Sequence, residues 1–125
     1  MVKRVSALLL ALLLLTAGTA NAGGVYYEIF PSSYRDTDGD GVGDLAGVTA
    51  SAAYLQSLGV NGIWLTPFFS GASYHKYDVL DYQSVDPSLG TLEDFDALAG
   101  EYHARGMRVM LDLVINHTSN EHPWF

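Results

Sequence analysis

The sequence predicts an α/β fold in which helices cross over between the strands of a parallel sheet. Three short apolar runs, at residues 25–30, 63–65 and 107–115, are typical of strands covered on both faces. Two segments with helical apolar spacing lie between them, so the order is β-α-β-α-β. This alternation favours a parallel sheet with right-handed crossovers.

The first strand is expected to stop at Pro31, and a helix is expected after the loop that follows. Gly59 stands where a C-cap glycine belongs, so the helix should end there. Its apolar stripe consists of Leu45, Val48, Ala52, Leu55 and Leu58. The second strand then ends at Pro67.

Residues 68–90 read as a long polar and aromatic connection, after which a second helix begins. Thr91 is a good N-cap, acidic residues occupy the first turn, and Gly106 closes the helix. The apolar stripe of this helix consists of Leu92, Phe95, Leu98, Ala99 and Tyr102. Residues 107–115 form the third predicted strand.

Residues 1–22 have the three regions of a secretory signal peptide. Lys3 and Arg4 are basic, residues 8–15 are Leu and Ala, and Ala20-Asn21-Ala22 is a small-residue cleavage pattern. The apolar run is too short to span a bilayer comfortably, which disfavours a transmembrane segment. We therefore expect cleavage after Ala22 and a secreted or periplasmic protein.

The composition of residues 23–125 limits the partners. This segment keeps all 14 acidic residues of the chain and has few basic ones, which argues against nucleic acid and anionic membranes. The basic residues are Arg35, Lys76, Arg105 and Arg108. The chain has no cysteine, so a hydrophobic core or a metal has to replace disulfides.

An acidic, glycine-rich loop at residues 36–44 predicts a Ca²⁺ site. Its carboxylates alternate along the loop, as in EF-hand loops, and a backbone carbonyl can add a further oxygen. The candidate ligands are Asp36, Asp38, Asp40, Val42 (through its carbonyl) and Asp44. Position 12 is Gly47, where an EF-hand needs a bidentate Glu, so the loop is only EF-hand-like. An ordinary Asp/Gly turn is the alternative.

The end of the third predicted strand carries polar residues inside an apolar run. Asp112 lies within the run, and Asn116 and His117 end it. A buried carboxylate is costly unless it is paired, and the carboxyl ends of parallel strands are where α/β sheets bind ligands. These residues are therefore a candidate binding site.

Four separated segments resemble the α-amylase family of glycoside hydrolases (family 13). They are YEIFPSSYRD at 27–36, GVNGIWLTP at 59–67, YHKYDVLDY at 74–82 and DLVINH at 112–117. The resemblance implies that residues 23–125 form the first β-α-β-α-β portion of a (β/α)8 barrel. It also implies that the chain ends near the start of a small domain inserted after the third strand.

The resemblance further implies a retaining enzyme that acts on α-glucosidic bonds of starch-like glucans or malto-oligosaccharides. In this family the nucleophile and the acid/base lie on later strands. We therefore assign no catalytic residue to this chain and expect the 125 residues alone to be inactive and poorly folded.

The resemblance assigns the first half of a sugar pocket. Tyr77 matches the aromatic platform beneath the sugar, Asp78 a carboxylate that holds the terminal glucose, and His117 an imidazole that binds a sugar hydroxyl. Asp112 matches an acid that orders its polar neighbours, and Asn116 a ligand of a second calcium in some members. The alternatives are a rim aromatic for Tyr77, a surface ion pair of Asp78 with the neighbouring lysine, and a turn histidine for His117.

A second function class is a non-catalytic calcium-binding module of a secreted or adhesion protein. Such modules usually repeat their Asp/Gly loop in tandem, whereas this chain has one copy. The β-α-β pattern around the loop also disfavours this class.

Overall fold

The computed structural model describes residues 23–125, and the expected signal peptide lies outside the described residues. A parallel sheet has the strand order β1-β2-β5, and a separate antiparallel pair is formed by β3 and β4. The strands are β1 (Tyr26–Ile29), β2 (Gly62–Leu65), β3 (Phe69–Gly71), β4 (Val79–Val85) and β5 (Arg108–Leu111). The helices are η1 (Pro31–Ser33), α2 (Leu45–Ala50), α3 (Ala52–Ser57) and α4 (Leu92–Ala104).

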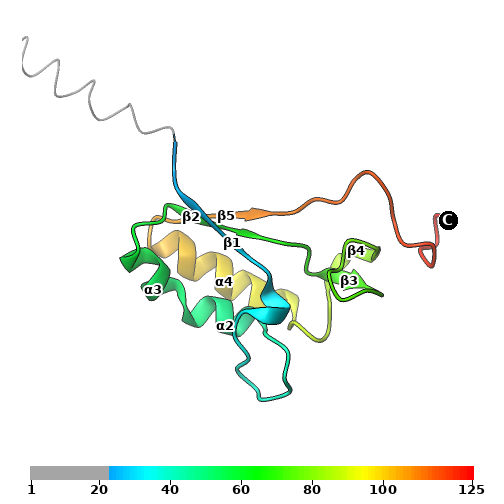
Figure 1. Ribbon diagram of the computed structural model, residues 1–125, viewed down its shortest axis with the longest axis horizontal. Coiled ribbons are helices and arrows are strands. Elements are labelled where there is room, and N and C mark those ends of the chain that lie inside the picture. The colour runs from blue at the N-terminus through cyan, green and yellow to red at the C-terminus, as the bar shows by residue number, and fades with distance from the viewer. Residues whose placement is uncertain (1–22) are drawn as a thin grey trace, which may run out of the picture.

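The predicted β-α-β-α-β order is confirmed. Helices α2 and α3 connect β1 to β2, and α4 connects the hairpin after β2 to β5, with all three helices on one side of the sheet (Figure 1). In the register, Ile29 lies beside Leu65, and Leu65 lies beside Leu111. The three strands therefore finish at one edge of the sheet, where the β3–β4 hairpin also lies (Figure 1).

The helix ends follow the local signals in the sequence. Thr91 and Asp94 form a reciprocal capping box at the start of α4, which satisfies backbone donors that the first turn leaves free. Gly59 and Gly106 have φ angles of 79° and 72°, a left-handed conformation that glycine adopts without a steric penalty. The predicted caps at these positions are confirmed.

The hydrophobic core lies between the sheet and the helices. Its fully buried members come from β1, β2, α2, α3 and α4, and include Ile29, Leu45, Val48, Leu55, Ile63, Leu65, Leu98 and Tyr102. The hydroxyl of Tyr102 donates to the carbonyl of Val48 at 2.9 Å, so α4 is also joined to α2 by a buried hydrogen bond. No helix of the described residues is long and apolar enough to cross a membrane.

The first predicted helix is interrupted in the structure. The sequence predicts one helix over residues 45–58, whereas α2 ends at Ala50 and α3 begins at Ala52. The hydroxyl of Ser51 donates to the carbonyl of Gly47 at 2.9 Å. A serine that bonds back to the preceding turn bends a helix, which accounts for the break at this residue.

The third predicted strand is too long. β5 spans Arg108–Leu111, so the prediction of a strand that runs to residue 115 is wrong. Asp112 donates its N–H to the carbonyl of Leu65, the last residue of β2, and the strand offers no further pairing. Leu113 and Ile115 are 66 % and 82 % exposed, and Asp112 is only partly buried.

The connection at residues 68–90 contains a hairpin that the sequence did not indicate. β3 has only three residues, and its register with β4 shifts twice. Such a short, irregular strand has no alternating apolar pattern to detect. The hairpin matters because residues 72–78, which join β3 to β4, carry Tyr77 and Asp78. These residues are called the 72–78 loop below.

Candidate functional site

The hairpin brings Tyr77 to the end of β5. The Tyr77 hydroxyl donates to Asp112 Oδ2 at 2.7 Å, although 35 residues separate the two in sequence. This hydrogen bond, followed by burial and the charge of Asp112, raises the pKa of Tyr77, so the phenol keeps its proton. Tyr77 is 43 % exposed, so part of its surface is accessible to a ligand. The structure therefore joins two of the predicted sugar-binding residues.

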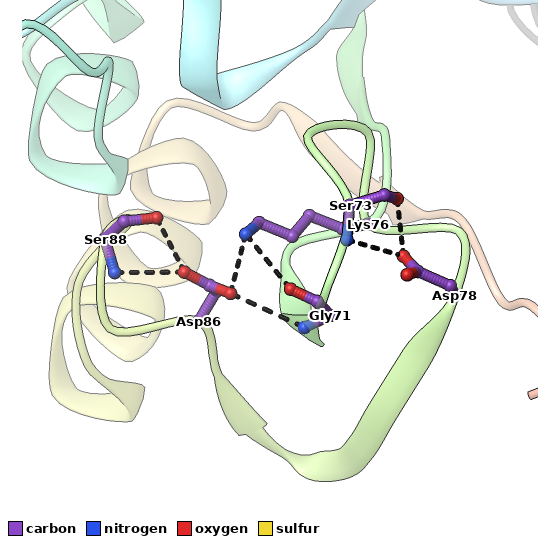
Figure 2. A network of polar contacts seen from close by, with 6 residues as sticks. All are labelled: Gly71, Ser73, Lys76, Asp78, Asp86 and Ser88. Atoms are coloured by element: carbon purple, nitrogen blue, oxygen red, sulfur yellow. Dashed lines mark hydrogen bonds and ion pairs between the residues drawn. The ribbon is translucent and has the colours of Figure 1, made fainter. Parts of the chain in front are cut away.

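Asp78 is held within the 72–78 loop. Its Oδ1 accepts the backbone N–H of Ser73 at 3.1 Å and the Ser73 hydroxyl at 2.5 Å. Burial raises the pKa of Asp78, but the hydrogen bonds from Ser73 outweigh it, and the pKa lies below its usual value. The surface pair of Asp78 with Lys76 that we considered is not formed, because the Lys76 ammonium lies 2.8 Å from Asp86 (Figure 2).

His117 and Asn116 lie farther along the segment after β5. Their side chains are exposed, and Asn116 Nδ2 is 3.3 Å from His117 Nδ1. Both border a groove of about 570 Å³. The groove is lined by Tyr82, Leu113, Val114, Ile115, Asn116, His117, Thr118 and Trp124. In the described part of the chain, the side-chain hydrogen bond of His117 is to Asn116 and not to the Tyr77–Asp112 pair.

Tyr82 is a residue whose contribution the sequence reasoning missed. Its hydroxyl lies 2.6 Å from the carbonyl of Val114 and 3.1 Å from that of His117, so β4 holds the segment after β5. Its ring is stacked near that of Trp124, with centroids 6.1 Å apart. Tyr82 ends the YHKYDVLDY segment, which was the available signal.

The acidic loop gathers three of its carboxylates. Ligand oxygens of Asp36, Asp38 and Asp40 all lie within 4.8 Å of one another. Asp36 accepts three backbone N–H groups, from Gly39, Gly41 and Asp38; the first two lower its pKa most, so the carboxylate stays charged. Three carboxylates this close repel one another unless a cation lies between them, so the set fits a hard divalent cation such as Ca²⁺.

The structure does not bring Asp44 into this set. Asp44 caps α2, with Oδ1 accepting the Gly47 N–H at 2.6 Å and Oδ2 accepting the N–H and hydroxyl of Thr37 at 2.8 Å. Val42 donates its N–H to Asp40 Oδ1 at 2.7 Å, so it lies beside the set. Asn116 lies on the segment after β5, and its assignment as a ligand of a second calcium stays a prediction.

The chain matches a known family along most of its length. Residues 28–125 match the family described as alpha amylase, catalytic domain. The chain belongs to the α-amylase family. It is 54 % identical to a probable alpha-glucosidase of Rhizobium meliloti over 104 residues, which are 82 % of this chain and 19 % of that protein. It is 50 % identical to a trehalose-6-phosphate hydrolase of Escherichia coli over 103 residues, 82 % of this chain and 19 % of that one.

Solved structures agree with the sequence comparison. The Amy13B structure from Eubacterium rectale superposes with a TM-score of 0.80 at 54 % identity, covering 82 % of this chain and 20 % of that chain. The chain therefore spans about a fifth of the length of the α-amylase-family relatives that it matches. The predicted fold class, a β-α-β-α-β portion of the family's (β/α)8 barrel, is confirmed.

Proposed function

We propose that this chain is the N-terminal part of a retaining glycoside hydrolase that acts on α-glucosidic bonds of starch-like glucans or malto-oligosaccharides. The observation that carries the proposal is the 2.7 Å hydrogen bond between Tyr77 and Asp112. It joins two separate segments of the family resemblance at the edge where the parallel strands end. That edge is where (β/α)8 barrels build their active sites.

In this proposal the described residues bind and orient the sugar. The exposed face of Tyr77 offers apolar contact to the C–H face of a glucose ring, and Asp112 fixes the ring's orientation. Asp78 and His117 supply a carboxylate and an imidazole for sugar hydroxyls. The nucleophile and the acid/base belong to strands beyond residue 125, so this segment supplies binding energy and alignment.

The names of the relatives support an α-glucoside as the substrate class. They include alpha-glucosidases, alpha-amylases, an oligo-1,6-glucosidase and a trehalose-6-phosphate hydrolase. All of these names denote glucoside hydrolysis, although with different linkages and chain lengths. Polymer breakdown outside the cytoplasm agrees best with the signal-peptide pattern of residues 1–22, so we propose a secreted or periplasmic enzyme.

We also propose that the acidic loop binds Ca²⁺ through Asp36, Asp38 and Asp40, with the Val42 carbonyl as a further ligand. When bound, the cation would neutralise the three carboxylates and tie the chain after β1 to α2. Asp44 contributes by capping α2 next to the cluster. Asn116, on the segment after β5, is retained as a candidate ligand of a second calcium.

The test starts from the coding sequence beyond residue 125. An Asp at the end of the fourth strand and a Glu at the end of the fifth are expected, and their absence would remove the proposed chemistry. The purified full-length protein should then release reducing sugar from malto-oligosaccharides, with Tyr77→Ala as the binding-deficient variant. A protein that binds calcium strongly but ignores glucans would instead favour the calcium-binding module of a secreted or adhesion protein.

A further inference from the structure

Lys76 stands directly before the proposed sugar-binding residues Tyr77 and Asp78 and has an unusual backbone conformation. Its φ angle is 62°, and it is the only non-glycine residue with a positive φ among residues 23–125. A side chain in the left-handed region is strained and persists where surrounding contacts hold it.

The Lys76 side chain leaves the 72–78 loop and reaches the base of the hairpin. Its ammonium lies 2.8 Å from Asp86 Oδ2 and 3.4 Å from the carbonyl of Gly71, the last residue of β3 (Figure 2). Asp86 directly follows β4 and accepts the N–H and hydroxyl of Ser88 at 3.0 and 2.6 Å. One charged pair thus connects the loop to both strands that carry it.

This pair differs from an ordinary surface ion pair. The Lys76 and Asp86 side chains are only 13 % and 10 % exposed, whereas those of Arg105 and Glu101 in α4 are 31 % and 40 % exposed. Burying an ammonium is costly unless it is paired and hydrogen-bonded, and removing one partner leaves the other charge uncompensated. The Arg105–Glu101 pair is therefore a matched control on the same chain.

Tyr77 is constrained from two directions. Its hydroxyl donates to Asp112. Its backbone is positioned by the preceding residue, Lys76, whose N–H donates to the carbonyl of Ser73 at 3.2 Å. Ser73 in turn holds Asp78 (Figure 2). The loop residues on both sides of Tyr77 are thus fastened to the hairpin by polar contacts.

We infer that the Lys76–Asp86 pair is a positioning device that sets the Tyr77 ring and the Asp78 carboxylate for the sugar. This inference rests on the proposed function, because it names residues that act on the substrate through Tyr77 and Asp78. Lys76 and Asp86 do not themselves contact the sugar. Asp86 keeps its charge, since hydrogen bonds from Lys76 and Ser88 outweigh the effect of burial and lower its pKa.

The main experiment is a double-mutant cycle in the full-length protein. Lys76→Met is expected to lower kcat/KM on a malto-oligosaccharide by roughly 10- to 100-fold, because small misplacements of binding groups cost about that much. In a Tyr77→Ala background the same substitution should cost markedly less, because only the placement of Asp78 is then left to lose. Arg105→Met, which breaks the exposed pair, should leave kcat/KM unchanged. Asp86→Asn, which keeps the size of the side chain, replaces Lys76→Met if that variant does not fold.

Amide hydrogen exchange gives a readout without substrate. Exchange in the 72–78 loop should accelerate in Lys76→Met and not in Arg105→Met. The inference would be overturned if the fold-losses of kcat/KM from Lys76→Met and Tyr77→Ala simply multiplied in the double variant. It would also be overturned if Lys76→Met lowered the melting temperature but left kcat/KM unchanged. If the wild-type protein cleaves no α-glucan, the proposed function fails, and the hydrogen-exchange comparison alone decides whether Lys76 holds the 72–78 loop. Equal exchange of this loop in the wild type and both variants would refute that role of Lys76.

Discussion

The role of Tyr77 can be divided between its ring and its hydroxyl. The side chain is 43 % exposed. If a tyrosine offers roughly 200 Å², about 90 Å² of this residue remains for a sugar to cover. At ~25 cal/mol per Å², that contact contributes about 2 kcal/mol. The ring face is thus the larger of the two contributions that Tyr77 can make.

The hydroxyl contributes less. Hydrogen bonds to charged groups stabilise by about 1.5–3 kcal/mol, but both partners here are partly exposed and water can replace the bond, so we take about 1 kcal/mol. Each ~1.4 kcal/mol of lost binding energy corresponds to a tenfold change. Tyr77→Phe, which loses the hydroxyl contribution, should therefore lower kcat/KM by roughly 5-fold, and Tyr77→Ala, which loses both contributions, by roughly 100-fold. Asp112→Asn keeps an acceptor for the hydroxyl and should resemble the wild type.

The assay is the initial rate of malto-oligosaccharide cleavage by the full-length protein, with far-ultraviolet circular dichroism to confirm that each variant is folded. The ratio between the Phe and Ala variants is the informative quantity. Equal losses in the two variants would show that the ring face does not hold the sugar. A loss in Asp112→Asn as large as in Tyr77→Ala would refute the ordering role of Asp112.

Three further outcomes follow from the contacts. EDTA should lower the melting temperature of the protein. Asp38→Asn should lower the melting temperature of the calcium-loaded protein, because a ligand is lost, and raise that of the chelated protein, because a repelling charge is lost. Scanning calorimetry of the wild type and the variant, with and without EDTA, measures both changes. Tyr102→Phe should cost only about 1 kcal/mol in urea unfolding, since the Ser51 N–H still pairs with the Val48 carbonyl; a much larger loss would contradict this. The pKa of Asp86 is lowered on folding, so its contribution is present above the unfolded value of about 3.9 and lost as pH falls below it. The stability difference between wild type and Asp86→Asn should therefore be constant from about pH 7 to 5 and shrink in stronger acid; a difference independent of pH would contradict this.

Local signals in the sequence predicted much of the fold. The capping box at Thr91, the left-handed glycines Gly59 and Gly106 and the helical stripes all depend on residues a few positions apart. Such interactions do not depend on where the segment lies in the fold, so the sequence alone predicts them. The acidic spacing likewise predicted that Asp36, Asp38 and Asp40 would gather.

The failures involve contacts between distant segments. The extent of β5 depended on where β2 stopped offering hydrogen bonds, because Asp112 pairs with Leu65 and no partner follows. The β3–β4 hairpin has an irregular register, so no periodic apolar pattern in the sequence marks it. In the site, the joining of Tyr77 to Asp112 likewise links segments that are 35 residues apart.

The sequence by itself determined the order of the elements, the family and the identity of the candidate sugar-binding residues, because these are properties of motifs and spacing. Only the tertiary structure decided which side chains meet. It joined Tyr77 to Asp112 and paired Lys76 with Asp86 in place of its near neighbour Asp78. A buried charge is compensated by whichever partner the fold places within reach, and distance along the chain does not specify that partner.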